Sequence, residues 1–441
     1  MTMLDIDQPI HDQIDELRTA TDTTVPPDVR AYYDGEHPPV ATVDQQMALG
    51  DRAIRPYVEN MLQRCTDALA SRLLFDRYVC DTDDDVQEAL DVFAAMNHMT
   101  RVMVTTTTRV IVDGNSALSL SWHIDGSRVV VHQEPWWDGT EGMYVETGSD
   151  GIEQWAVKEW TPLGGSKRRT VYLPDQIQRF VQNGSGWQPL ADDHIQPWTK
   201  RSGKPLGVPV IHFGAGSTDG SMYGDSRIAP LLGLQDALNG TLFDIVAAQA
   251  MNAFGIYTAT GVSSDTALGV GPGRLWKTEA ADASFGVLNG SSMTEIMGGY
   301  KAIRSAIASQ FPVAEHIVSG GDWPSGLALQ KVEGPMIGAV KRLGDTMAPA
   351  WVRVAHRAVE MMNAYGDATL DEDALVQVRY EPAEQMDEGT TTEIDMAKVN
   401  VYRELAALPR ALMLKTGLVD EDEADAIIAE RDSLVIADAG F

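Results

Sequence analysis

The spacing of hydrophobic residues divides the sequence into helical and strand-rich stretches. In the helical stretches, apolar residues recur every three or four positions, as on one face of an amphipathic helix. The helices we predict span residues 51–79, 84–103, 226–252, 293–311 and 327–364. Pro335 and Pro349 lie inside the last and longest of them. We expect them to kink it, because proline donates no backbone hydrogen bond.

Between residues 102 and 213 the pattern changes to short segments rich in β-branched and aromatic residues. Turn-forming pairs such as Asp113-Gly114, Asp125-Gly126 and Asn183-Gly184 separate them, as in hairpins. The expected strands span residues 109–112, 117–122, 128–132, 155–160, 170–173, 178–181, 208–213 and 376–380. Because helices do not alternate with the strands of this region, the pattern predicts antiparallel sheet within an α+β protein.

The two ends of the chain differ from the middle. Two proline pairs, Pro26-Pro27 and Pro38-Pro39, interrupt the first fifty residues. We therefore expect an extended, exposed arm there, with one short helix at residues 11–18 and with Tyr32 and Tyr33 as a hydrophobic anchor. The C-terminal part is expected to hold two helices, at residues 392–408 and 420–431.

Composition and charge exclude two classes of protein. Of the 441 residues, 44% are hydrophobic and 22% charged, so the chain is not a disordered protein. It carries 34 basic and 64 acidic residues, a net charge of −30, which excludes a general nucleic-acid-binding surface. Residues 293–365 hold seven basic and six acidic residues, so the acid is concentrated elsewhere. Mixed charges on solvated helix faces, or closeness to a polyanion without tight binding, would each account for this nearly neutral segment.

Few features point to a secreted or membrane protein. Cys65 and Cys80 are too few for a disulfide framework or a thiolate zinc cluster, and they fit a reduced, cytosolic place of assembly. The acidic start lacks the basic and apolar regions of a signal peptide. No run of 18 apolar residues occurs, so we expect no transmembrane helix and no membrane partner.

One glycine-rich turn is the only candidate for a nucleotide site. Gly214-Ala-Gly216-Ser-Thr-Asp-Gly220 follows an expected strand and precedes a helix, as a dinucleotide-binding turn does. Its spacing is G-x-G-x-x-x-G, however, and Asp236 falls inside the next helix instead of at a strand end. A flexible turn before a helix capped near Asp225 or Ser226 also explains the pattern.

Other catalytic and metal-binding signatures are missing. The sequence has no Walker motif, no G-x-S-x-G elbow and no histidine pair with zinc-ligand spacing. The acidic triplet Asp83-Asp84-Asp85 fits the first turn of a helix, where the helix dipole favours negative charge. His212 and His356 fit structural roles. The sequence therefore predicts a protein that is not an enzyme, with no cofactor, no metal and no catalytic residue.

Several fragments, taken in order, resemble the portal protein of tailed bacteriophages, of the type found in long-tailed phages of actinobacteria. The fragments occupy residues 32–38, 57–73, 209–213, 223–231, 235–239, 307–312 and 324–335. The last of them, Pro324-Ser-Gly-Leu-Ala-Leu followed by Glu333-Gly-Pro and a long helix, is the most specific. The resemblance covers residues 28–410, and its specificity comes from the order and spacing of the fragments.

The resemblance implies a phage portal fold: a ring, usually of twelve subunits, at one capsid vertex. Double-stranded DNA would pass through its central channel during packaging and ejection. The implied parts are an N-terminal arm (1–50), a wing of helices and antiparallel strands (51–224), a stem helix (225–254), a small clip (255–292), a second stem helix (293–311), a tunnel loop (312–326), a long kinked helix (327–365), and a wing-return strand with acidic crown helices (366–441). The short, glycine-rich clip departs from the family pattern.

The resemblance also implies the functional residues and partners. The tunnel-loop candidates for DNA contact are His316, Ser319, Gly320, Gly321, Asp322, Trp323 and Pro324. Lys301 and Arg304 are candidates to face the channel, and Arg274, Trp276 and Lys277 of the clip are candidates to bind partners. The implied partners are the terminase large subunit, the head–tail connector or adaptor, and the major capsid and scaffolding proteins. The protein would assemble in the host cytoplasm and reside in the virion.

Three alternatives stay open. Trp323 can pack against a neighbouring helix instead of touching DNA. A nucleotide-binding enzyme could use the turn at residues 214–220. Another oligomeric, capsid-associated head protein is the third, although adaptors are usually much shorter than 441 residues.

Overall fold

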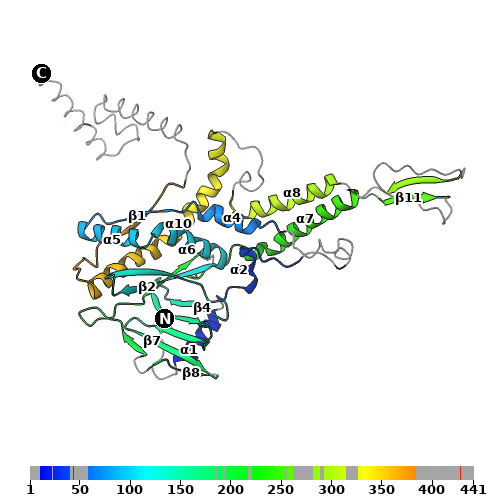
Figure 1. The fold of residues 1–441 in the computed structure, drawn as a ribbon. Helices are drawn as coiled ribbons and strands as arrows, with labels where there is room; N and C mark the ends of the chain where they lie inside the picture. The colour runs from blue at the N-terminus through cyan, green and yellow to red at the C-terminus, as the bar shows by residue number, and fades with distance from the viewer. Residues whose placement is uncertain are drawn as a thin grey trace, which may run out of the picture. The chain divides into compact units, whose positions relative to one another are not determined.

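The computed structural model describes residues 10–21, 23–39, 43, 58–184, 186–191, 194–216, 221–253, 256–261, 282–288, 293–313, 326–383 and 428. The fold is mixed α+β, and its sheets are antiparallel (Figure 1). The chain divides into two compact units, one of residues 1–323 with 331–383 and one of residues 324–330 with 384–441. Nearly all the described residues belong to the first unit, and the account below concerns that unit.

The largest sheet is a meander in which neighbouring strands along the chain also pair in space. Apolar residues of its strands are buried, and Tyr144 pairs with Val157, which pairs in turn with Val171. The sixth and last strand is the exception, because it pairs with the fourth strand and not with the fifth. The strands are β4 (Gly142–Thr147), β5 (Glu153–Trp160), β6 (Arg168–Tyr172), β7 (Gln176–Asn183), β8 (Gly186–Pro189) and β9 (Ile195–Pro197).

A second, three-stranded sheet packs on the first. Its order is β10 (Val210–Gly214), β2 (Asn115–His123), β3 (Arg128–Glu134). Strand β10 lies against β4 and β5, and β2 lies against β4. Trp351 from the long helix α10 (Gly326–Tyr365) stacks on Phe213 at 4.6 Å between ring centroids, so the core continues from the sheets into the helices. The antiparallel β region expected between residues 102 and 213 is confirmed from residue 115 onward.

The helix expected over residues 51–79 is wrong in its last third. The described helix, α4, covers Met61–Ala70, and Phe75–Val79 form strand β1. β1 pairs with β13 (Gln377–Tyr380), where the sequence did predict a strand. On its other side, the Gln87 side chain bonds the Tyr78 carbonyl at 3.0 Å and accepts the Cys80 N–H at 2.7 Å. The strand therefore forms because a distant segment and a neighbouring helix satisfy its backbone.

The helix expected over residues 84–103 is two helices, α5 (Asp84–Met96) and α6 (Met99–Asp113). The break at Asn97 has a structural use, because its amide bonds the backbone of Val129 and Val131 on the edge strand β3. The acidic triplet has the expected role, since the Asp83 carboxylate accepts the N–H groups of Asp85 and Val86 at the helix start.

The strand expected at residues 109–112 is wrong, because these residues end α6. Their β-branched side chains favour a strand locally, but they are buried among the helices and sheets. Asp113-Gly114 is correspondingly a helix end instead of a hairpin turn. Gly114 has a left-handed φ of 81°, and a Cβ there would lie 2.3 Å from the Gly224 carbonyl oxygen.

The long helix α10 contains both expected prolines. Pro335 and Pro349 are exposed, and each leaves the carbonyl four residues earlier without its helical N–H partner. Figure 1 shows α10 changing direction between its yellow and orange parts. The prediction of a long, kinked helix is confirmed over residues 331–365.

The described part of the N-terminal arm is folded onto the body, which corrects the expectation of an extended, exposed arm. Helix α1 (Ile10–Thr21) includes the expected helix at residues 11–18, and Tyr32 and Tyr33 lie in a second helix, α2 (Pro27–Asp34). Ile14, Val25 and Val29 are buried. The Arg30 guanidinium pairs with the fully buried Asp113 carboxylate at 2.9 Å. Proline at the start of α2 begins a helix here, a position that suits its fixed φ.

Candidate functional site: the helix pair α7–α8 and its root

Two antiparallel helices form the candidate site. α7 (Leu232–Ala253) follows a short 3₁₀ turn (Ala229–Leu231), and α8 (Met293–Gln310) packs beside it, as Figure 1 shows. Between them along the chain come β11 (Ile256–Thr260) and β12 (Ser284–Leu288), which pair as an antiparallel hairpin. Both helices lie where the periodicity predicts them.

The helix pair carries little charge. In α7 the charged residues are Asp236 and Asp244, and in α8 they are Glu295, Lys301 and Arg304. Apolar residues occur on all sides of α7, which is typical of a helix covered on more than one face. In this chain its main helical neighbour is α8.

Four glycines of the pair face open space. Among the described residues, a Cβ built on Gly233, Gly240, Gly298 or Gly299 would meet no atom within 4 Å apart from the backbone of its own helix. Packing within this chain therefore does not require glycine at these positions. Glycine inside a helix costs about 0.5–1 kcal/mol relative to alanine, so the residues weaken the helices without benefit to the isolated chain.

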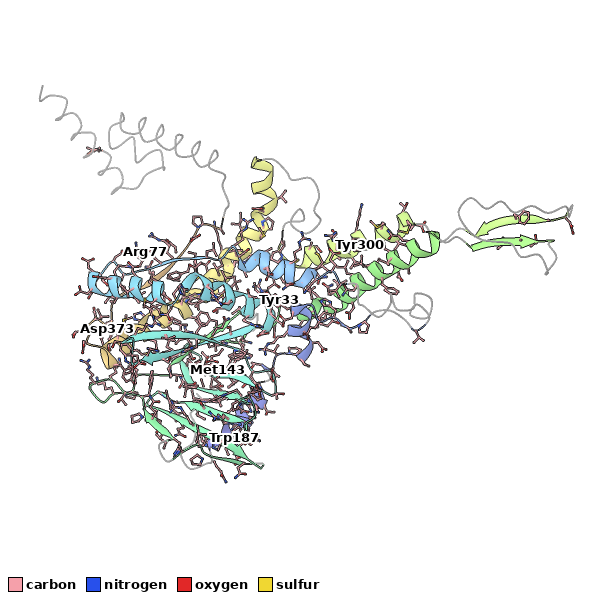
Figure 2. The ribbon with its side chains drawn as sticks, in the orientation of Figure 1. Tyr33, Arg77, Met143, Trp187, Tyr300 and Asp373 are labelled. Carbon is pink, nitrogen blue, oxygen red and sulfur yellow. The ribbon has the colours of Figure 1, made fainter. Side chains whose placement is uncertain are left out.

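The base of α8 is tied to the segment before α4 through one carboxylate. Glu59 accepts a hydrogen bond from the Tyr300 hydroxyl, and its Oε1 lies 3.3 Å from a guanidinium nitrogen of Arg304. The guanidinium also lies 5.4 Å from the centroid of the Tyr300 ring. Tyr300 is labelled on α8 in Figure 2. Arg304, a candidate to face a channel, is thus half-buried and engaged by Glu59.

The base of α7 is tied to the same segment by two buried amides. The Gln235 amide donates to the Glu59 carbonyl at 2.7 Å and accepts the Met61 N–H at 3.1 Å. The Asn239 side-chain oxygen accepts the Glu59 N–H at 3.1 Å. Both amides are almost completely buried, so these bonds satisfy polar groups that water cannot reach.

Residues of the N-terminal region complete this set of contacts at the base of the helix pair, which we call the root. Its residues are Tyr32, His37, Glu59, Gln235, Asp236, Asn239, Tyr300 and Arg304. The Asn239 amide nitrogen lies 2.9 Å from His37 Nδ1, and His37 Nε2 lies 3.0 Å from the Tyr32 carbonyl. Asn239 therefore donates to Nδ1, and Nε2 carries the ring proton. Burial lowers the pKa of His37, which keeps the ring neutral. The Tyr32 hydroxyl donates to Asp236 at 2.7 Å, and burial with this bond raises the pKa of Tyr32 to about 12.

Sequence reasoning missed this root network. The members of the network outside α8 come from residues 32–37, 59–61 and 235–239, which lie within three of the fragments that carry the portal resemblance. Polar residues recurring within otherwise apolar segments were the available signal. Nothing in one sequence indicates that these segments touch.

The other predicted site residues divide into two groups. Lys301 is exposed on α8. The tunnel-loop candidates (His316, Ser319, Gly320, Gly321, Asp322, Trp323 and Pro324) and the clip candidates (Arg274, Trp276 and Lys277) lie outside the described residues. The helix expected at 392–408 lies outside them too, as does the one expected at 420–431 apart from residue 428. For these residues the assignments stay predictions.

The geometry around Gly214 does not fit a dinucleotide site. β10 ends there, paired antiparallel with β2, and no βαβ unit surrounds the turn within the described residues. A Cβ on Gly214 would lie 2.5 Å from the Met222 carbonyl oxygen, so the chain itself occupies the space beside the glycine. The carboxylate of Asp236, which would bind a ribose, is bonded by Tyr32.

His212 has a structural role, as the sequence suggested. Its Nε2 lies 3.0 Å from the Asn115 side-chain oxygen, and burial together with Arg353 lowers the pKa of His212 to about 3. In the described part of the chain no three His, Cys, Asp or Glu side chains gather as metal ligands would. No described helix combines the length and the apolar run that crossing a bilayer requires.

No protein-family model matches this chain, and neither does any curated protein. Among the solved structures that resemble it are chains from gene transfer agent particles. One chain, from the neck of an empty particle computed with C6 symmetry, is 13% identical, with a TM-score of 0.47 over 92% of this chain and 94% of that chain. Another, from the neck of a native particle computed with C12 symmetry, is 16% identical, with a TM-score of 0.47 over 93% and 97%. A third, from the virion of the native particle, is 15% identical, with a TM-score of 0.44 over 88% and 93%. Likenesses of this size do not assign the chain to a family.

Proposed function

We propose that this protein is a portal protein: a non-enzymatic, ring-forming conduit for double-stranded DNA at one vertex of a phage-type capsid. The observation that carries the proposal is the α7–α8 pair. This helix pair has three properties together: low charge, apolar residues on all sides of α7, and glycines that face open space in the single chain. The ordered sequence fragments that resemble portal proteins support the same function.

The open glycines have a use if other copies of the chain approach the pair closely. Subunits arranged head to tail by rotation form a closed ring, in which each helix pair lies between two others. Small residues let helix backbones come close together, and the uncovered side of α7 then becomes buried. We propose twelve subunits, with α7 and α8 as the stem around the channel.

The low charge of the pair suits a channel for DNA. Each phosphate that a protein neutralises adds affinity through counterion release, so a strongly basic channel would hold DNA instead of letting it slide. The Glu59–Arg304 contact lowers the basic character of the pair further. In this proposal Lys301 meets DNA transiently, and Trp323 with its neighbours in the loop at 312–326 contacts DNA in the channel.

The proposed partners follow from the same role. The clip, with Arg274, Trp276 and Lys277, would bind the terminase large subunit during packaging and the head–tail connector afterwards. Major capsid and scaffolding proteins would contact the outer parts. The ATPase would be the separate terminase protein, and the portal itself would need no cofactor.

Mass photometry with negative-stain imaging of the purified chain tests the proposal. We expect rings of about twelve copies of 48.0 kDa with a central hole. The double substitution Gly298→Phe with Gly299→Phe should abolish these assemblies and leave folded, smaller species. The two phenylalanine side chains would fill space that is open in the single chain and that a neighbouring copy would need.

Gly186→Phe is the matched control, since a Cβ at this glycine of β8 also meets nothing within 4 Å. Its rings should form normally. A chain that stays monomeric or dimeric with added scaffolding and capsid proteins would contradict the portal proposal. Rings that survive the substitutions in α8 would contradict the role given to the helix pair.

A further inference from the structure

A cleft of about 680 Å³ opens where the two large sheets separate. The sheets meet along β10, β2, β4 and β5. The cleft is lined by β2 and β3 on one side and by β5, β6, β7 and β9 on the other. Its volume is in the range of ligand-binding pockets. Exposed residues such as Ile124 and His132 stand among its lining residues, so the cleft is open to solvent.

One end of the cleft is aromatic. Trp198 and Tyr365 lie 5.4 Å apart between ring centroids, and Trp122 and Tyr365 lie 6.2 Å apart. The Trp198 indole nitrogen donates to the Gly207 carbonyl at 2.8 Å, which fixes the orientation of that ring. These rings offer a preformed apolar wall to a large side chain.

The other end presents Arg179, a cation that no carboxylate of the described residues neutralises. Arg179, half-buried on β7, donates at 2.7 Å to the neutral side-chain oxygen of Gln196, and among the described residues no carboxylate lies within 4 Å of its guanidinium. Lys158 differs, because it pairs with Glu134 at 2.7 Å. Glu134 in turn accepts the Ser119 hydroxyl at 2.8 Å and is buried. In a protein of net charge −30, Arg179 is therefore available to an incoming carboxylate.

Two further residues of the cleft lining hold donors without partners. The Gln133 amide nitrogen and the Tyr365 hydroxyl are buried and make no hydrogen bond within the described residues. Water does not reach either atom, so both belong to the packed wall of the cleft and are not contact points for a ligand. The accessible features of the cleft are the Arg179 guanidinium and the aromatic wall.

We propose that this cleft binds an acidic peptide segment carrying an aromatic side chain. A carboxylate of the peptide pairs with the Arg179 guanidinium, and the aromatic side chain packs on Trp198 and Tyr365. Nucleic acid fits less well, because a phosphate backbone is held by many cations along its length, and among the described residues the cleft offers one guanidinium without a carboxylate partner. None of the residues that line the cleft belongs to α7 or α8.

The probe is the peptide acetyl-Glu-Glu-Phe-Glu-Glu-Lys-amide, with fluorescein on the lysine side chain. Its fluorescence anisotropy is measured as the full-length protein is added. We expect saturable binding that weakens with salt, and at least tenfold weaker binding of the Gln-Gln-Phe-Gln-Gln analogue. Arg179→Gln should weaken binding of the acidic peptide by about tenfold to a hundredfold, the size expected for a lost charge-assisted hydrogen-bonded pair.

Gln196→Glu provides a second variant that does not threaten folding, since Gln196 is exposed on β9. It places an internal carboxylate beside Arg179 and should weaken peptide binding at least tenfold. Gln188→Glu, which adds the same charge on exposed β8 outside the cleft lining, should bind like the parent protein. Three results would each overturn the proposal: no saturation at millimolar concentrations, unchanged binding by Gln196→Glu, or stronger binding of single-stranded oligonucleotide than of peptide.

Discussion

Glu159 on β5 illustrates how single residues fix the N-terminal arm. Its side chain is 2% exposed and lies 2.7 Å from Arg169, 2.7 Å from Lys167 and 2.9 Å from Arg18 of helix α1. Arg18 also stacks on Trp137, with 3.6 Å between its guanidinium carbon and the ring centroid. One buried carboxylate thus joins α1 to the large sheet. Burial alone would raise the pKa of Glu159, but its three cations outweigh burial and hold the pKa below its ordinary value.

Glu159→Gln should lower the free energy of unfolding by about 2–4 kcal/mol at pH 7, because it removes the carboxylate of Lys167 and leaves Arg18 and Arg169 with Asp15 as their remaining partner. A depressed folded-state pKa stabilises the protein at pH values above the unfolded-state pKa, about 4.3, and this contribution is lost as the pH falls through the folded-state pKa. The difference between parent and variant should therefore narrow below about pH 4. Urea titrations across this pH range measure it.

Asp91→Asn is the matched control for that experiment. Asp91 pairs with Arg77 at 2.9 Å, but both side chains are nearly half exposed. Its removal should change the free energy of unfolding by less than about 1 kcal/mol. Equal effects of the two substitutions would contradict the structural importance given to Glu159.

At the scale of elements, the root of the helix pair joins α2, α4 and α7. Asn239→Ala should lower the free energy of unfolding by about 2–4 kcal/mol, because the Glu59 N–H and His37 Nδ1 then lose their partner in a buried place. It should also speed proteolytic cleavage within residues 23–39, since His37 holds this segment to α7. Urea denaturation and limited proteolysis followed by mass spectrometry give the two readouts.

Asn183→Ala removes an amide of the same size at the exposed end of β7 and should leave both readouts near the parent values. Cleavage of residues 23–39 at the parental rate in Asn239→Ala would show that α1 and α2 alone hold the arm, independently of the root.

The elements that the sequence predicted best are those with a long, regular period. α7, α8 and α10 end where glycine-rich or proline-rich segments interrupt a helical pattern, so local sequence sufficed for them. The strand β1 was not predicted because the apolar stripe that indicates a helix runs to Leu73, directly before the strand, and because its partner β13 lies near the end of the described chain. The end of α6 was predicted as a strand because its β-branched residues favour strands locally. In the folded chain these residues are buried and helical.

The candidate site shows the same limit at the level of side chains. The low charge of α8 and the absence of catalytic motifs are properties of composition, so one sequence displays them. The pairing of Arg304 with Glu59, and of Asn239 with His37, depends on segments separated by many elements. Such contacts become visible only when the chain is folded.

At the scale of the whole molecule, the proposed ring should hold DNA weakly. Glu295 is exposed on α8, and Glu295→Lys would place an added positive charge on the stem in every subunit. We expect the variant rings to bind linear double-stranded DNA more tightly than the parent rings do. The slope of the logarithm of affinity against the logarithm of salt concentration should become steeper by about 0.9 for each added phosphate contact. Electrophoretic mobility shifts at 50–200 mM salt, roughly the range over which such effects are large, provide the measurement.

Asp373→Lys controls for net charge, since Asp373 is an exposed residue just after α10, outside the helix pair (Figure 2). Its rings should bind DNA as the parent rings do. An equal increase for both variants would mean that DNA responds to the overall charge of the ring and not to the α7–α8 pair.

The pairing of β1 with β13 has a consequence for the timing of folding. β1 leaves the ribosome early, but the strand that completes it is made only after every other described element up to α10. Contacts between segments so distant in sequence form slowly, and unpaired strand edges are prone to wrong association while they wait. Gln87 already covers one edge of β1 from the adjacent helix, which limits that exposure. A polypeptide that stops before residue 377 lacks β13, so one edge of its β1 has no partner strand.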